Sequence, residues 1–260
     1  MRYDVKTRES RTLLTGKVYA EFNGREASGH LPSLCLDLLA QQKRTWPLLR
    51  KGYESIGRGT ERHVSCKGFS VLLQHNPGRV KSTLAAVGEQ DISRRPCFLC
   101  LSHLPEEQKG VLYRSTYLIL GNPMPVFPAH FTVAHVNHRP QAISAHADTL
   151  LKLMADFGPG WTLLYNGPKC GASAPDHFHF QAVPSGRMPV ESEIREKGRI
   201  TLITRNYDVA LYRAKRIGRE VIVIEGGSLT AVGTAFKAFL NALKRVLSAH
   251  EEPMINVIGL

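Results

Sequence analysis

The order of apolar and polar positions along the chain predicts both helices and strands. Apolar residues at helical spacing, including Leu34, Leu38 and Leu39, predict a helix within residues 31–57, and Pro47 divides or bends it. The same spacing predicts further helices. They cover residues 146–157 and 229–250.

Short apolar or alternating runs, several of them bounded by Gly and Pro turns, predict strands. These runs lie at residues 68–74, 117–123, 127–138, 161–167, 177–184 and 220–226, with shorter ones within 200–214 and at 254–260. The chain therefore contains helices and strands together.

A polar segment with Gly and Pro at residues 185–199 is the best internal boundary. We therefore predict an N-terminal helical region over 1–66, a central core over 67–185 and a strand-and-helix extension over 186–260. Because the apolar run at 254–260 looks like the start of a strand, we expect the chain to end within a second half-repeat.

Composition places the chain among ordinary globular proteins, with 260 residues, 43% of them apolar and 22% charged. No run of 18 apolar residues exists and the first residues lack a secretory signal, so we expect no membrane partner. An odd count of five cysteines is typical of a reducing compartment, which predicts a cytoplasmic protein.

The formal net charge of +12 favours anionic partners. The basic residues are dispersed, without a long block of like charge and without interleaved aromatic residues. We therefore expect small phosphorylated ligands ahead of nucleic acid. A basic turn after the strand at 68–74 contains Arg79, which we interpret as a phosphate contact, although an ordinary solvated turn has the same composition.

The strongest candidate for chemistry is the sequence His177-Phe178-His179-Phe180-Gln181. Successive side chains of a strand point to opposite faces, so the two histidines and the glutamine share one face and the phenylalanines enter the core. We expect the imidazole of His179 to face an open pocket beside Gln181. The alternative is a strand with two surface histidines that have no catalytic role.

Two further motifs, both earlier in the chain than this signature, are candidates for binding phosphate or a metal. The turn at residues 166–175 is rich in Gly and can present backbone N–H groups to phosphate oxygens. Cys97 and Cys100 form a C-x-x-C pair, a spacing at which thiolates bind zinc together with histidines. The candidate histidine partners are His130, His135, His138 and His177.

Together these motifs resemble the histidine-triad superfamily, and in it the branch of galactose-1-phosphate uridylyltransferase, diadenosine tetraphosphate phosphorylase and GDP-galactose phosphorylase. His177, His179 and Gln181 match the H-x-H-x-Q signature of that branch. The Gly171-Ala172-Ser173 segment is similar to the phosphorylases. The chain as a whole resembles a bacterial family with the sequences Arg-Pro-Cys-Phe-Leu-Cys and Pro-Asp-His-Phe-His-Phe-Gln.

The resemblance implies an α+β fold, with an antiparallel sheet, packed helices and a histidine-triad-like catalytic core over residues 67–185. This chain departs from the family's pattern at Asp176, which precedes the first histidine, and at the bulky Phe178 and Phe180. The phosphorylase relatives often lack the metal.

The resemblance also implies roles for individual residues. His179 is the nucleophile, Gln181 stabilises the transition state, and Ser173 contacts the leaving phosphate. Asn166 and Gly171 contact the substrate. The implied structural zinc site consists of Cys97, Cys100, His138 and His177, with His130 or His135 as replacements for His138.

The implied function is nucleotidyl transfer or phosphorolysis of a nucleoside diphosphate sugar or a dinucleoside polyphosphate. It proceeds through a nucleotidyl-histidine, with phosphate or a sugar phosphate as the acceptor. The resemblance also allows a homodimer. The alternatives are a nucleotide hydrolase of the same superfamily and a non-catalytic, zinc-stabilised module that binds nucleotide or RNA.

Overall fold

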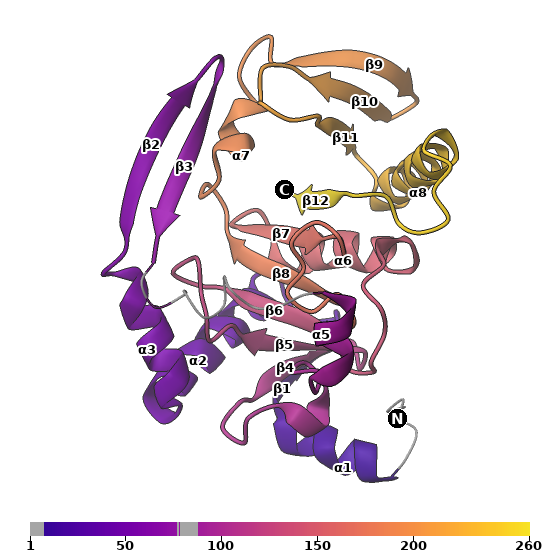
Figure 1. Cartoon of the computed structure of the whole chain (residues 1–260). Helices are drawn as coiled ribbons and strands as arrows, with labels where there is room; N and C mark the ends of the chain where they lie inside the picture. Colours follow the sequence, from indigo (N-terminus) through magenta and orange to yellow (C-terminus); the bar gives the residue numbers. More distant parts are fainter. Residues whose placement is uncertain (1–7, 77, 79–87) are drawn as a thin grey trace.

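The structure is a computed structural model, and it describes residues 8–76, 78 and 88–260 (Figure 1). The elements surround one large sheet, with a hairpin on one side and a smaller sheet near the C-terminal helix. Among the described helices, none combines the length and apolarity that a membrane crossing requires.

The large sheet has seven strands in the order β1-β4-β5-β6-β8-β7-β12. Their bounds are Val18–Phe22 (β1), Gly110–Tyr113 (β4), Tyr117–Gly121 (β5), Phe131–His135 (β6), Trp161–Asn166 (β7), His179–Pro184 (β8) and Asn256–Gly259 (β12). All neighbouring strands are antiparallel except β1 and β4, which are parallel.

Each face of this sheet has its own apolar core. On one face, buried residues of the sheet and of several helices form a single cluster that includes Phe131, Phe178 and Phe180, each 0% exposed. The helices that contribute to it are α2 (His30–Thr45), α3 (Pro47–Ile56), α6 (Ala147–Phe157) and α8 (Leu229–Val246). The second cluster contains Cys97, Cys100 and Ala174.

The segments on the second face include α1 (Arg8–Lys17), α5 (Glu89–Arg94) and a 3-10 turn at Leu101–His103. Leu13 and Leu14 of α1 pack against the cluster, and so does Leu101 of the turn. The two faces therefore differ, because the face that carries Cys97 and Cys100 is covered by short segments instead of long helices.

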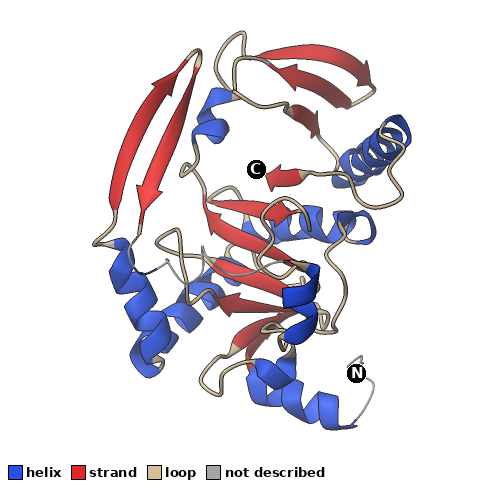
Figure 2. Ribbon diagram, viewed as in Figure 1, coloured by secondary structure: helices blue, strands red, loops and turns tan. Residues whose placement is uncertain are grey.

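The remaining elements form two small units, drawn as red strands above the large sheet in Figure 2. The hairpin consists of β2 (Thr60–Cys66) and β3 (Phe69–His75). The three-stranded sheet consists of β9 (Ile200–Asn206), β10 (Val209–Ala214) and β11 (Ile222–Gly226), and α7 (Pro189–Glu193) precedes it.

The expected α+β fold, with an antiparallel sheet and packed helices, is confirmed. Pro47 does separate two helices, and the helix expected over 146–157 is α6. The pattern of apolar and polar positions did not predict β1, β2 or β4. The large sheet takes strands from all three ranges 1–66, 67–185 and 186–260. The division of the chain into these three regions stays a prediction.

Candidate active site and metal centre

The signature lies on β8, near the middle of the large sheet, between β6 and β7. Phe178 and Phe180 are 0% exposed and belong to the core on one face, as the alternation predicted. His179 and Gln181 are two residues apart on β8 and therefore share the opposite face. The strand begins at His179, so His177 lies in the segment just before it instead of within it.

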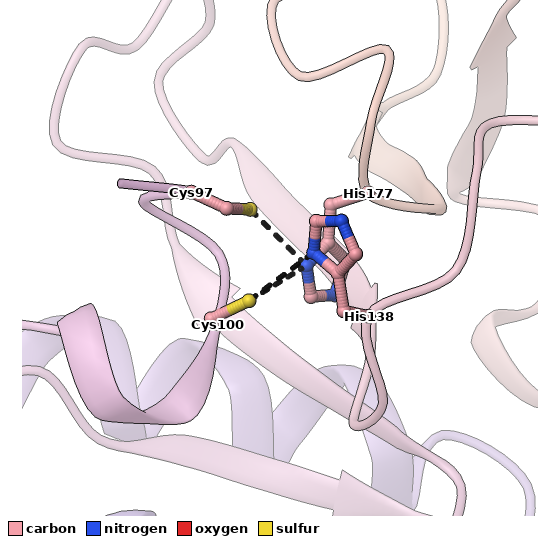
Figure 3. A group of neighbouring side chains, drawn as sticks. All are labelled: Cys97, Cys100, His138 and His177. Carbon is pink, nitrogen blue, oxygen red and sulfur yellow. Dashed lines mark hydrogen bonds between the residues drawn. The ribbon is translucent and has the colours of Figure 1, made fainter. Parts of the chain in front are cut away.

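Four of the predicted residues converge at the start of β8, as Figure 3 shows. The ligand atoms of Cys97, Cys100, His138 and His177 all lie within 4.8 Å of one another. The Sγ of Cys97 is 3.3 Å from Nδ1 of His177, and the Sγ of Cys100 is 3.2 Å from Nδ1 of His138. The Sγ of Cys100 is also 3.7 Å from Nδ1 of His177.

These separations fit a tetrahedral metal site. Ligands at zinc bond lengths of about 2.0 to 2.3 Å in a tetrahedron lie roughly 3.3 to 3.8 Å apart. Nε2 of His177 donates a hydrogen bond to the carbonyl of His135 at 2.7 Å, which leaves Nδ1 with its lone pair toward the two sulfur atoms. Two thiols and two imidazoles with this geometry are compatible with a structural metal ion.

The two thiols are electrostatically linked. The hydrogen bond with Cys100, and then burial, raise the pKa of Cys97 to about 12. The pKa of Cys100 is lowered, chiefly by the same hydrogen bond. Metal binding would require both sulfur atoms to be deprotonated, because thiolates are the metal ligands.

The alternative histidines have other partners. Nδ1 of His130 accepts a hydrogen bond from the N–H of Val126 at 3.2 Å. Nδ1 of His135 accepts one from the N–H of Asn137 at 3.0 Å. Neither belongs to the cluster of possible ligands, so the structure places His138 there.

His179 has one fixed ring nitrogen. Its Nδ1 donates to the carbonyl of His177 at 2.9 Å, so the lone pair of the neutral ring is at Nε2. Burial lowers the pKa of His179 to about 4, which keeps the imidazole neutral near pH 7. Among the residues that the structure describes, Nε2 has no hydrogen-bond partner.

The expectation that His179 faces an open pocket is wrong for this structure, because the side chain is only 4% exposed. The hydrogen bond from Nδ1 of His179 to the carbonyl of His177 holds the ring close to the backbone. A hollow of about 560 Å³ lies elsewhere, beside the turn between β4 and β5. It is lined by Asn23, Arg25, Glu26, Arg114 and Ser115.

Gln181 has a defined amide orientation. Nδ1 of His130 accepts a hydrogen bond from the N–H of Val126, so Nε2 of His130 carries the proton. This Nε2–H donates to Oε1 of Gln181 at 2.7 Å. The NH₂ group of Gln181 is then the part of the amide left to donate to a ligand. The sequence indicated His130 only as a metal ligand, so this contact to Gln181 was missed.

The other predicted residues lie at various distances from this strand. Asn166 ends β7 and is half-buried, on the same face as His179, because Leu164 two residues earlier is paired with Gln181. Ser173 and Gly171 lie in the exposed loop that follows, and within the described residues no hydrogen bond joins them to His179 or Gln181. Arg79 lies outside the described residues.

Two side chains that the sequence did not indicate hold the signature segment. Arg95 forms an ion pair with Asp176 at 3.4 Å and also donates to the carbonyl of Ser173. Gln141 donates to the carbonyl of His179 and accepts from its N–H. Gln141 belongs to no motif, and Arg95 begins the Arg-Pro-Cys-Phe-Leu-Cys sequence without a predicted contact to the signature. Both roles follow only from long-range contacts.

The comparison with protein families gives one match. The family described as domain of unknown function (DUF4922) matches residues 38–184, which is more than half of the chain. The chain belongs to this family. A search of curated proteins found no match.

Solved structures of one enzyme are similar to this chain. The crystal structure of yeast Ap4A phosphorylase Apa2 in complex with Ap4A has a TM-score of 0.44 and 13% identity, covering 82% of this chain and 76% of that chain. The same yeast enzyme in complex with AMP has a TM-score of 0.45 and 14% identity, covering 85% and 76%.

Proposed function

We propose that this protein is a nucleotidyltransferase or phosphorylase whose nucleophile is His179. The observation that carries the proposal is the state of that ring, with Nδ1–H committed to the carbonyl of His177 and the lone pair at Nε2. A neutral imidazole in a fixed tautomer is the form that attacks phosphorus. The substrate class, a nucleoside diphosphate sugar or a dinucleoside polyphosphate, comes from the resemblance of the H-x-H-x-Q signature.

The reaction would take two steps. Nε2 of His179 bonds to the α-phosphorus while the bond from that phosphorus to the bridging oxygen breaks, and the leaving phosphate keeps the electron pair. An oxygen of phosphate or a sugar phosphate then attacks the same phosphorus, frees the imidazole and completes the transfer. The NH₂ group of Gln181, which His130 orients, would donate to a non-bridging oxygen as its charge grows.

Asn166, Gly171, Ser173 and Arg79 remain proposed contacts to the substrate. Cys97, Cys100, His138 and His177 would hold a zinc ion, and its chemistry would be structural, since all four ligand positions come from the protein. Through His177 this site would hold the carbonyl to which Nδ1 of His179 is hydrogen-bonded. The metal site would thus stabilise the nucleophile's geometry without touching the substrate.

A non-catalytic, zinc-stabilised binding module is the second candidate, and the burial of His179 favours it. With 4% of the side chain exposed, a substrate must displace neighbouring groups before it reaches Nε2. A binding module needs the metal cluster and a ligand surface but no access to His179. The two candidates therefore differ in one measurable property, which is a covalent bond to His179.

Labelling of the protein tests the proposal. The protein is incubated with UDP-glucose, GDP-glucose or diadenosine tetraphosphate, each labelled at the α-phosphate, and an acid-labile label on the protein is expected. His179→Gly should abolish the label, whereas His63→Gly, at an exposed histidine of β2, should keep it. A nucleotide imidazolide should restore transfer to the acceptor in the His179→Gly protein.

The outcomes separate the alternatives. Because His179 is buried, circular dichroism must first show that the variant is folded. Turnover of the nucleotide in the absence of added phosphate would indicate a hydrolase. Binding without label or turnover would indicate the non-catalytic module, and an unchanged label in His179→Gly would exclude His179 as the nucleophile.

A further inference from the structure

The pairing of β7 with β8 stops beside the proposed nucleophile. It runs from Trp161 opposite Pro184 to Leu164 opposite Gln181, and it does not continue to Asn166 and His179. Both of these residues still lie within their strands. Backbone groups at this point of the sheet are buried, and they need partners from elsewhere.

The side chain of Gln141 supplies those partners. Its Oε1 accepts from the N–H of His179 at 2.8 Å. Its Nε2 donates to the carbonyl of His179 at 3.0 Å and to the carbonyl of Asn166 at 2.9 Å. Gln141 is 2% exposed, and its two bonds to His179 are buried, where an unmade hydrogen bond is costly.

The backbone on either side of Gln141 is fixed to the same segment. The N–H of Gln141 donates to the carbonyl of Pro175 at 3.1 Å, and the N–H of Phe178 donates to the carbonyl of Arg139 at 2.6 Å. The residues from Arg139 to Gln141 are therefore held beside the start of β8. The amide side chain is inserted between two strands in the manner of a peptide group.

We infer that Gln141 is a positioning residue, which fixes the backbone of His179 relative to Asn166 and thereby the direction of the His179 imidazole. This inference rests on the proposed function for its catalytic meaning. The geometry requires a side chain that both donates and accepts at the right length. Glutamine meets this requirement, whereas methionine has similar length and volume without either capacity.

The catalytic test compares two buried glutamines. In Gln141→Met we expect the rate of label formation on His179 to fall by about 10²-fold while KM for the nucleotide changes little, because small displacements of a reacting group cost about that much. Gln42→Met is the matched control. Gln42 is 1% exposed and donates to the carbonyl of Glu107, and Oε1 of Gln42 lies near Gly121 in the core of the opposite face.

A rate in Gln141→Met within twofold of that in Gln42→Met would overturn the inference. Gln141→Asn is the second variant, in case the first does not fold, because it keeps an amide that is too short to reach all three groups. The same loss of rate with unchanged KM is expected for it. A rise in KM alone would instead assign Gln141 a role in substrate binding and would also overturn the inference.

A measurement without substrate separates this inference from the proposed function. In the wild-type protein the amide hydrogen of His179 should exchange slowly, since its acceptor is Gln141, and its NMR signal should be sharp. In the Gln141 variants this signal should broaden or shift, and in Gln42→Met it should not. If no label forms in the wild type, the proposed function fails, and this signal still decides the role of Gln141. Fast exchange in the wild type would refute that role.

Discussion

Strand alternation was enough to predict on which face of the sheet most residues of the signature lie. The alternation placed Phe178 and Phe180 in the core and His179 with Gln181 on the other face, and the structure agrees. It could not predict that His179 is buried, because burial depends on segments that cover the sheet from elsewhere in the chain. The contact of His130 with Gln181 joins residues 51 positions apart, and no local pattern reveals it.

The candidate metal ligands were predicted from a different kind of signal. The C-x-x-C spacing indicated Cys97 and Cys100, and the family resemblance selected His138 among several histidines. The structure brings these residues together with His177. Gln141 had no such signal, since a single glutamine in a connecting segment carries no spacing or motif from which its three bonds could be predicted.

At the residue scale, Gln181→Ala should slow the formation of labelled protein by on the order of 10²-fold, as the loss of one transition-state donor does. The fold should remain, because Gln181 is half-buried and lies on the face opposite the phenylalanine core. Single-turnover labelling measures the rate. Gln181→Glu is the matched control.

Gln181→Glu keeps the length of the side chain and an acceptor for His130 but removes the NH₂ donor. It should therefore be as slow as Gln181→Ala or slower. If Gln181→Glu retained the wild-type rate, the amide would not act as a donor in the transition state.

At the element scale, the strands that the sequence missed are short, as β4 is, pair with a distant segment, as β1 does, or are mostly polar and exposed, as β2 is. β4 has four residues, and β1 pairs with it in parallel across about ninety positions of the chain. Their hydrophobic patterns are too brief to separate them from loops. The strands that were predicted, such as β5 and β7, have longer apolar runs and clear turns at their ends.

The cluster of possible metal ligands joins a loop to the ends of two neighbouring strands. It joins the loop at Cys97–Cys100, the segment after β6 at His138, and the residue before β8 at His177. Removing a metal that binds only the folded state lowers the stability of that state. We therefore expect a strong chelator to lower Tm by several degrees, and Cys97→Ser to lower it by a similar amount.

Cys66→Ser is the control for this prediction. Cys66 is a half-buried cysteine of β2 that lies outside the cluster, and its variant should respond to the chelator as the wild type does. Differential scanning calorimetry measures Tm, and elemental analysis measures bound zinc. If the purified protein contained no zinc and the chelator left Tm unchanged, the zinc assignment would be refuted while the nucleophile would remain to be tested.

At the scale of the whole molecule, we expect buried and half-buried imidazoles to make the stability depend on pH. His146 stacks on Phe178 with ring centroids 3.7 Å apart, and its Nδ1 is 2.6 Å from the hydroxyl of Tyr117. Burial, followed by the nearby His135 and Arg139, lowers the pKa of His146 to about 4 from the ordinary value of 6.5. Burial also lowers the pKa of His135. The folded state thus favours neutral rings in this region.

The sign of the effect follows from proton binding. Between about pH 6.5 and 4 the unfolded chain binds more protons at His146 than the folded chain does, so the free energy of unfolding falls as the pH falls through this range. One such group contributes at most about 1.4 kcal/mol per pH unit. We expect urea unfolding at a series of pH values to show this loss of stability in the wild type.

His146→Phe identifies the source of that dependence. The variant keeps an aromatic ring against Phe178 but removes the titrating nitrogen, so its unfolding free energy should change less between pH 6.5 and 4 than that of the wild type, whatever its stability at pH 7. His63→Phe, at an exposed position of β2, should leave the wild-type slope unchanged. Equal slopes in His146→Phe and the wild type would mean that the acid sensitivity of the fold arises from groups other than His146.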